Sequence, residues 1–124
     1  MKPPTLSGGE KQRVSIARAF AHPCNTLLMD EAFQSLDLRI KFQLMELFSS
    51  LIKAEKKTVL LVTHDIREAL CLADRIIVCI GTPMSICFDT KISHQDDKKS
   101  MAHTYINLSE ENLSIQKKIL DILS

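Results

Sequence analysis

The spacing of apolar and polar residues predicts alternating helices and strands along most of this chain. Ser7 occupies the N-cap position of a first helix that is expected to end near residue 21, just before a proline. Residues 26–29 and 58–63 are continuous apolar runs, which indicates strands covered on both faces, as in a parallel sheet. Between them, apolar residues at helical spacing predict a long helix over 38–54. The residues that the first helix is expected to bury are Val14, Ile16, Ala17 and Phe20.

The middle of the chain is predicted to contain one more helix followed by a strand. Asp65 is suited to cap a short helix over 66–73, and the apolar run 75–80 predicts a third strand. Gly81-Thr82-Pro83 predicts a turn, after which residues 84–88 can return as a hairpin partner. Three repeats of helix followed by strand imply an α/β fold with a parallel sheet.

The last third of the chain is more polar. Residues 89–105 have no clear period and are interpreted as a loop or connector. An amphipathic helix is predicted over 109–123. Packing of this helix back on the domain is the simpler interpretation, and docking to a partner protein is the alternative.

Composition narrows the class of protein. The chain has 124 residues, of which 45% are hydrophobic and 25% charged, as in one ordinary globular domain. A net charge of +1 gives no argument for binding nucleic acid or an anionic membrane surface. The apolar runs are far shorter than the roughly 20 residues of a membrane span, and the N-terminus has no apolar leader pattern. A cytoplasmic protein is therefore expected.

The cysteines and three of the histidines carry no motif. No C-x-x-C pair is present, and most of the cysteines lie in or beside apolar runs, so reduced buried thiols are the favoured interpretation. A metal site or a disulfide framework stays open as the alternative. The histidines without a readable partner pattern are expected at the surface. These residues are Cys24, Cys71, Cys79, Cys87, His22, His94 and His103.

Polar residues stand where an α/β sheet binds its ligand. Asp30, Glu31 and His64 each come just after the carboxyl end of an apolar strand, which is the edge where open α/β sheets bind ligands. Gly8 and Gly9 open the first helix, where free N–H groups and the helix dipole attract phosphate. Taken alone, this helix start is equally well interpreted as a capped helix after a loop.

Four segments, in order, resemble the motifs of ATP-binding cassette (ABC) proteins. They are the signature motif (6–20), the Walker B strand (27–31), the D-loop (35–37) and the switch-histidine region (62–65). The resemblance implies a partial P-loop NTPase, or RecA-like, parallel sheet with flanking helices, in which the N-terminal half of the cassette is missing. Mild departures are Ala32, where the family usually has proline, and Gln34-Ser35, where Ser-Ala is common; they are expected to retune the site.

The resemblance implies roles for the residues at the strand ends, with ATP and Mg²⁺ as cofactors. Asp30 would hold Mg²⁺ through water, because hard cations prefer carboxylate oxygen. Glu31 would act as general base or orient the attacking water, and His64 would bind the γ-phosphate and align that water with Glu31. Without the motif context, Glu31 would be a solvated acid and His64 a structural histidine.

The resemblance also implies a second subunit. Two cassettes pair head to tail, so that each ATP lies between the P-loop of one subunit and the signature of the other. The residues expected at this interface, in contact with the γ-phosphate or close to it, are Ser7, Gly8, Gly9 and Asp37.

Two motifs of the family are absent from these 124 residues. No G-x-x-x-x-G-K-[ST] occurs, because the only glycines are Gly8, Gly9 and Gly81, and the family's Q-loop is missing as well. The chain alone is therefore expected to be inactive, and to fold poorly or expose an apolar sheet edge. The expected division is cassette half (1–88), polar connector (89–108) and terminal helix (109–124).

Residues 64–76 indicate a branch of the family. They resemble the H-D-x-x-E-A-x-x-L-A-D-R pattern of bacterial importers, and the following region looks most like the nitrate/sulfonate/taurine group. The implied function is that of an ATP-hydrolysing subunit which drives solute import through membrane permease subunits, at the inner face of the cell membrane and without nucleic acid. The alternatives are a truncated remnant that cannot bind ATP, and a cassette of DNA repair or translation. The latter is disfavoured because no coiled-coil insertion or basic patch is present.

Overall fold

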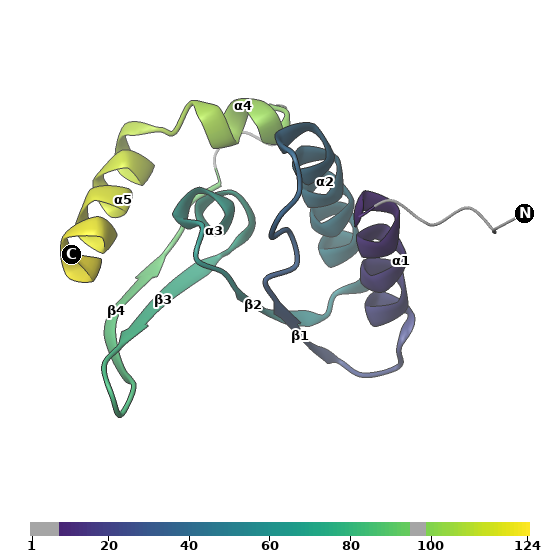
Figure 1. Ribbon diagram of the computed structural model, residues 1–124, viewed down its shortest axis with the longest axis horizontal. Helices are drawn as coiled ribbons and strands as arrows, with labels where there is room; N and C mark the ends of the chain where they lie inside the picture. Colours follow the sequence, from purple (N-terminus) through teal and green to yellow (C-terminus); the bar gives the residue numbers. More distant parts are fainter. Residues whose placement is uncertain (1–7, 95–98) are drawn as a thin grey trace, which may run out of the picture. The chain divides into compact units, whose positions relative to one another are not determined.

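The computed structural model describes residues 8–94 and 99–124 of the chain. These residues form two compact units, and the division between them falls between Thr63 and His64. Figure 1 shows the elements of both units in the colours of the sequence.

The helices of the first unit are α1 (Gly8–Ala21) and α2 (Leu38–Glu55), close to the predicted bounds. They contact each other and lie on the same side of the first two strands (Figure 1). Ile16 and Phe20 of α1 are buried as predicted, but Val14 and Ala17 are exposed. The buried face of α1 is therefore a narrow line of residues toward α2, and Val14 lies outside it.

Three aromatic rings form the centre of the first unit. The ring of Phe48 on α2 packs edge-on against Phe20 at a centroid distance of 5.7 Å and against Phe33 at 5.6 Å. Phe33 and Phe48 are almost completely buried. The edge-to-face geometry is one of the favoured arrangements of aromatic pairs. These contacts join α1, α2 and the loop that follows the first strand.

The first unit contains a parallel pair of strands, β1 (Thr26–Asp30) and β2 (Thr58–Val62). The prediction that both faces are covered is wrong: Leu27 and Met29 are buried, whereas Leu28 is 66% exposed and its neighbour Leu60 is 57% exposed. Within the described part of this unit, both helices lie on one side of the pair. The sequence predicted that an apolar edge of the sheet is exposed, whereas in the structure it is an apolar face of the β1–β2 pair that is exposed.

The third strand does not join the parallel pair. β3 (Arg75–Ile80) pairs antiparallel with β4 (Ser85–Lys91), and among the described strands these two form a separate sheet. The prediction of a third parallel strand is therefore wrong, whereas the predicted hairpin is confirmed. Gly81, with a φ of 94°, turns the chain back so that β4 takes up the hydrogen bonds of β3.

The remaining helices of the second unit are α3 (Ile66–Leu72), α4 (Met101–Ile106) and α5 (Glu110–Leu123). The loop predicted over 89–105 instead contains the end of β4 and all but the last residue of α4, because Ser100 caps a helical turn there. Gln95-Asp96-Asp97-Lys98 of that stretch lies outside the described residues. The terminal helix is confirmed, and it packs on its own unit through the buried cluster of Leu70, Ile76, Val78, Ile92, Ile115 and Ile119.

The described helices give no membrane segment. None of those in residues 8–94 and 99–124 combines the length and the apolar character that crossing a bilayer requires.

Candidate functional site

The two acids that follow β1 have different surroundings. Asp30 is the last residue of the strand and is exposed. Glu31 has a φ of 54°, which is uncommon for a residue other than glycine, and its backbone N–H donates to the Val62 carbonyl at 2.8 Å. One carboxylate oxygen of Glu31, Oε1, is buried. The left-handed backbone turns Glu31 out of the strand direction, so two adjacent acids face different environments, as a metal ligand and a base would require.

The loop after Glu31 is tied to the signature helix. Gln34 N–H donates to the Glu31 carbonyl at 3.2 Å, and Ser35 is a second residue with positive φ, at 63°. Ala32 is buried, and its carbonyl oxygen accepts a hydrogen bond from the side-chain amide of Gln12 on α1. Alanine at this position therefore leaves a well-packed loop. This hydrogen bond links α1 to the loop that follows Glu31.

The signature glycines have a packing role that the sequence did not indicate. A Cβ added at Gly9 would lie 2.5 Å from Cγ2 of Ile40 on α2, whereas one added at Gly8 would lie 3.4 Å from Leu36. Gly9 is buried for this reason, since only a hydrogen atom fits between the two helices. Ser7 lies outside the described residues. Contact of these residues with a nucleotide stays a prediction.

Asp37 likewise has a structural task. Its carboxylate accepts a hydrogen bond from the Ile40 N–H at 3.0 Å and so caps α2. The sequence suggested Asp37 only as an interface residue. The cap places this acid at the N-terminus of a long helix, on the loop that begins at Glu31.

The switch-histidine segment opens the second unit. His64 is exposed, and the next residue, Asp65, caps α3 by accepting from the N–H groups of Arg67 at 3.0 Å and Glu68 at 3.3 Å. The cap on α3 was predicted from the sequence and is confirmed. His64 is thus held directly before a helix start that is fixed by a side-chain cap.

A contact from α4 reinforces this helix start. The Tyr105 hydroxyl donates to Oδ2 of Asp65 at 2.5 Å, and the Arg67 guanidinium donates to the carbonyl oxygens of Tyr105 at 2.7 Å and Ile106 at 3.1 Å. Sequence reasoning missed Tyr105, which lies in the stretch interpreted as a connector. A single tyrosine in a polar segment gives no signal of a partner some 40 positions earlier in the chain.

The predicted site residues fall in both units. Gly8, Gly9, Asp30, Glu31 and Asp37 belong to the first unit, and His64 is the first residue of the second. Within the first unit, the turn after β1 carries both acids and leads directly to the cap at Asp37.

The chemistry of these side chains fits a magnesium ion held through water. In residues 8–94 and 99–124, no three side chains of the ligand types His, Cys, Asp and Glu are grouped closely enough to form a protein cage for a metal ion. Mg²⁺ usually keeps several waters and takes one or two carboxylates together with substrate phosphates. The exposed Asp30 at the end of β1 suits that mode of binding.

The described cysteines differ from the sequence prediction. Only Cys71 is buried, and Cys24, Cys79 and Cys87 are exposed free thiols. The prediction of buried thiols is therefore wrong for three of them, because the strands that carry two of these residues have an exposed face. His22, His94 and His103 are exposed, as predicted.

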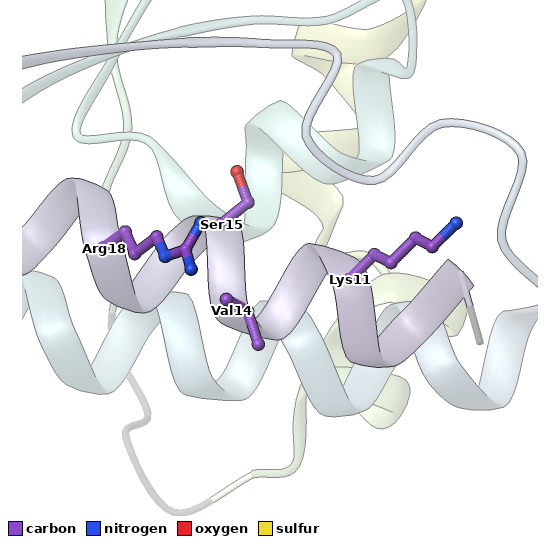
Figure 2. A pocket seen from close by; sticks show the side chains of 4 residues that line it. All are labelled: Lys11, Val14, Ser15 and Arg18. Carbon is purple, nitrogen blue, oxygen red and sulfur yellow. The ribbon is translucent and has the colours of Figure 1, made fainter. Parts of the chain in front are cut away.

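A shallow hollow lies on one face of α1. Figure 2 shows that all its lining side chains come from this helix: Lys11, Val14, Ser15 and Arg18. Their spacing of three and four residues places them on one helical face. No acid and none of the predicted catalytic residues lines the hollow, so its chemistry does not match the site at the strand ends.

Comparison with known proteins identifies relatives. Residues 1–34 match the family model of the ABC transporter. The chain is 42% identical over 92 residues to an aliphatic sulfonates import ATP-binding protein of Rhodococcus jostii (strain RHA1), covering 74% of this chain and 37% of that protein. It is 36% identical over 118 residues to such a protein of Agrobacterium fabrum (strain C58 / ATCC 33970), covering 95% and 42%.

A third relative extends the same result. An aliphatic sulfonates import ATP-binding protein of Bacillus cereus (strain ATCC 10987 / NRS 248) is 36% identical over 118 residues, covering 95% of this chain and 44% of its own length. The chain thus spans less than half the length of these relatives. The resemblance to ATPase subunits of ABC importers, most like the nitrate/sulfonate/taurine group, was drawn above from the motifs and is confirmed.

Proposed function

We propose that this chain, a homologue of ABC transporter ATP-binding proteins, is part of an ATPase that drives solute import. It supplies the signature, the Walker B strand, the D-loop and the switch histidine. The observation that carries the proposal is the register of the first sheet. Asp30 pairs with Val62 at the carboxyl ends of β1 and β2, and Glu31 N–H bonds the Val62 carbonyl. Adjacent parallel strands end at one edge, where α/β proteins bind ligands.

The chain connection supports a shared site for Glu31 and His64. His64 follows Val62 by two residues, and a peptide chain spans at most about 3.3–3.6 Å per residue. The covalent connection therefore limits how far the His64 backbone can lie from Val62. On the proposed function, both side chains act on one water molecule at the terminal phosphate of ATP.

The proposed division of labour follows from the environments of these groups. ATP brings the phosphate to be transferred, and Mg²⁺ neutralises its charge. Asp30, exposed at the strand end, binds the metal through water. Glu31, turned out of the strand with a partly buried carboxylate, orients or deprotonates the attacking water. His64 holds the γ-phosphate and the water in line.

On this proposal, another polypeptide segment binds the phosphates of ATP. These 124 residues contain no P-loop sequence, whose backbone and lysine hold the phosphates in this class of enzyme. That segment is either further sequence of a longer protein or a separate chain. On this proposal a second ATPase subunit pairs head to tail, and permease subunits hold the complex at the inner face of the cell membrane.

The names of the relatives suggest a class of imported solute. The proteins named above act in import of aliphatic sulfonates, and we extend this to the present chain as the class of solute to test first. The cassette itself does not contact the cargo, so the assignment depends on the permease with which it works.

A second candidate function is an inactive remnant. The lack of a P-loop sequence in these residues favours it, because retained motifs without a phosphate grip cannot bind nucleotide. Both proposals predict that the 124-residue chain alone does not bind Mg-ATP at micromolar concentration. Nucleotide binding to the chain by itself therefore cannot separate the two.

A chimaeric protein distinguishes the active ATPase from the inactive remnant. The chain is fused in place of the matching region of the Rhodococcus jostii relative, so that the relative supplies the P-loop, and steady-state phosphate release is measured. We expect ATP hydrolysis in the chimaera, and a loss of at least 100-fold with Glu31→Gln while ATP binding persists. A folded chimaera that binds ATP without hydrolysing it would support the remnant. Unchanged turnover in Glu31→Gln would remove Glu31 from its proposed role.

A further inference from the structure

We propose that Cys79 and Cys87 form a cross-strand dithiol site, which low-molecular-weight disulfides such as oxidised glutathione convert reversibly into an internal disulfide. Both thiols are free and exposed, and they lie on the two strands of one hairpin. The role proposed for the strand-end acids does not involve this hairpin, so the dithiol site is independent of it.

Cys79 and Cys87 lie at a bulge in the hairpin. Val78 pairs with Phe88 and Cys79 pairs with Ile86, so Cys87 is the extra residue between two consecutive pairs. At a bulge, two residues of one strand oppose a single residue of the other. Cys79 therefore faces both Ile86 and Cys87, and it has a thiol as a direct neighbour across the ladder.

The burial pattern puts both thiols on the same face. Val78 is buried, and Phe88 packs against the core cluster of the second unit, so this pair marks the inner face. Cys79, Ile86 and Cys87 are all exposed, which places them on the outer face. Alternation along each strand agrees with this placement, because Cys79 follows the inward Val78 and Cys87 precedes the inward Phe88.

The spacing of the strands suits a disulfide. Directly paired residues of antiparallel strands have Cα atoms about 4.5–5.5 Å apart, and Cys87 is adjacent to Ile86, the residue that pairs with Cys79. Disulfides span about 4.4–6.8 Å between Cα atoms. The Cys87 thiol now donates to the Ser85 carbonyl over 3.7 Å. A thiol is a weak donor, so rotating Cys87 away from this contact and toward Cys79 costs little.

The reaction balances with the disulfide as oxidant. The thiolate of one cysteine attacks a sulfur of oxidised glutathione and forms a mixed disulfide, which expels one glutathione thiolate. The thiolate of the second cysteine then attacks the protein sulfur of that mixed disulfide and expels the second glutathione. Two protein thiols lose two protons and two electrons, and one glutathione disulfide becomes two glutathione thiols. Excess reduced glutathione reverses both steps.

The test uses the complete chain and glutathione redox buffers from fully reduced to fully oxidised. Free thiols are counted with a chromogenic disulfide reagent after quenching, and peptide mass mapping locates the links. We expect one peptide pair joined through Cys79 and Cys87 with no glutathione attached to either, whereas the exposed Cys24 can only take up a mixed disulfide with glutathione. Reduced buffer should restore all four thiols.

Single variants provide matched controls, because each replaces an exposed side chain. Cys24→Ser removes an exposed thiol of the first unit and should leave the internal link unchanged, whereas Cys79→Ser should leave Cys87 as a free thiol or a mixed disulfide. Three results would overturn the proposal: both hairpin thiols free in fully oxidised buffer, glutathione on each of them, or a link from either one to Cys24.

Discussion

The two sheets of the molecule are built from similarly apolar strands but differ in what they present on their outer faces. The outer face of β1–β2 carries Leu28, Leu60 and Val62, with no charged residue among them until Asp30 at the strand end. The outer face of the β3–β4 hairpin carries the bidentate Arg75–Asp89 ion pair beside its apolar residues. Antiparallel sheets commonly leave one face in water, whereas parallel sheets are almost always covered on both.

The two sheets therefore differ in how their faces are covered. The hairpin has its inner face covered by helices of its own unit, and its outer face carries the polar pair beside the exposed Ile77 and Ile86. The parallel pair presents leucines where an α/β protein places another layer. The proposed function accounts for this, because the phosphate-gripping segment of a cassette would add to the same unit.

The largest expected effect comes from breaking the aromatic centre of the first unit. Phe48→Ala should lower the free energy of unfolding by about 3–5 kcal/mol, since the ring is fully buried between two others. Hydrogen exchange should show lost protection in residues 8–63 and little change in the second unit. The matched variant Ile119→Ala removes a buried side chain of the second unit and should give the converse pattern. Equal loss in both units from either variant would contradict two separate cores.

A smaller effect is expected at the close approach of α1 and α2. Gly9→Ala should cost about 1–3 kcal/mol, because the new methyl group meets Cγ2 of Ile40. Gly8→Ala is the matched control and should cost nothing, since its methyl group has ordinary room. Urea unfolding of both variants measures the difference. The cost of Gly9→Ala should vanish in an Ile40→Ala background; a cost that persists there would exclude this clash as its cause.

The smallest expected effect concerns the outer face of the hairpin. The hydrogen bonds from Arg75 lower the pKa of Asp89, so the pair stabilises the fold above the ordinary aspartate pKa of about 3.9 and loses this effect as pH falls through the lowered value. Asp89→Asn should therefore shift the urea midpoint slightly at about pH 6 and not at all at about pH 2. Asp121→Asn, at an exposed acid on α5, serves as control. A difference that grows at low pH would contradict the sign.

Much of the fold follows from local sequence, and the errors come from non-local packing. Helical spacing predicted α2 and α5 almost to the residue, and Asp65 was predicted as the cap of α3. An apolar run indicates a strand but does not say what covers it, which is why the exposure of Leu28 was missed. Strand order is also non-local: nothing in residues 75–80 states whether β3 extends the parallel pair or pairs with β4.

In the candidate site, too, local features were predicted from the sequence and non-local contacts were not. Motif spacing located Asp30, Glu31 and His64 at strand ends, because the end of an apolar run is a local feature. The packing of Gly9 on Ile40 and the hydrogen bond from Tyr105 to Asp65 depend on partners far away in the sequence. Such contacts leave no pattern in a single chain, although they hold helices that adjoin the segments carrying site residues.

The most direct test of the proposed shared water is a double-mutant cycle on turnover in the chimaera, with Glu31→Gln, His64→Ala and the two combined. If both side chains act on one water, each single variant loses at least 100-fold in turnover, and the double variant is hardly slower than the slower single one. If the losses instead multiply, the two residues act separately. The account of a joint site at the ends of β1 and β2 would then be wrong.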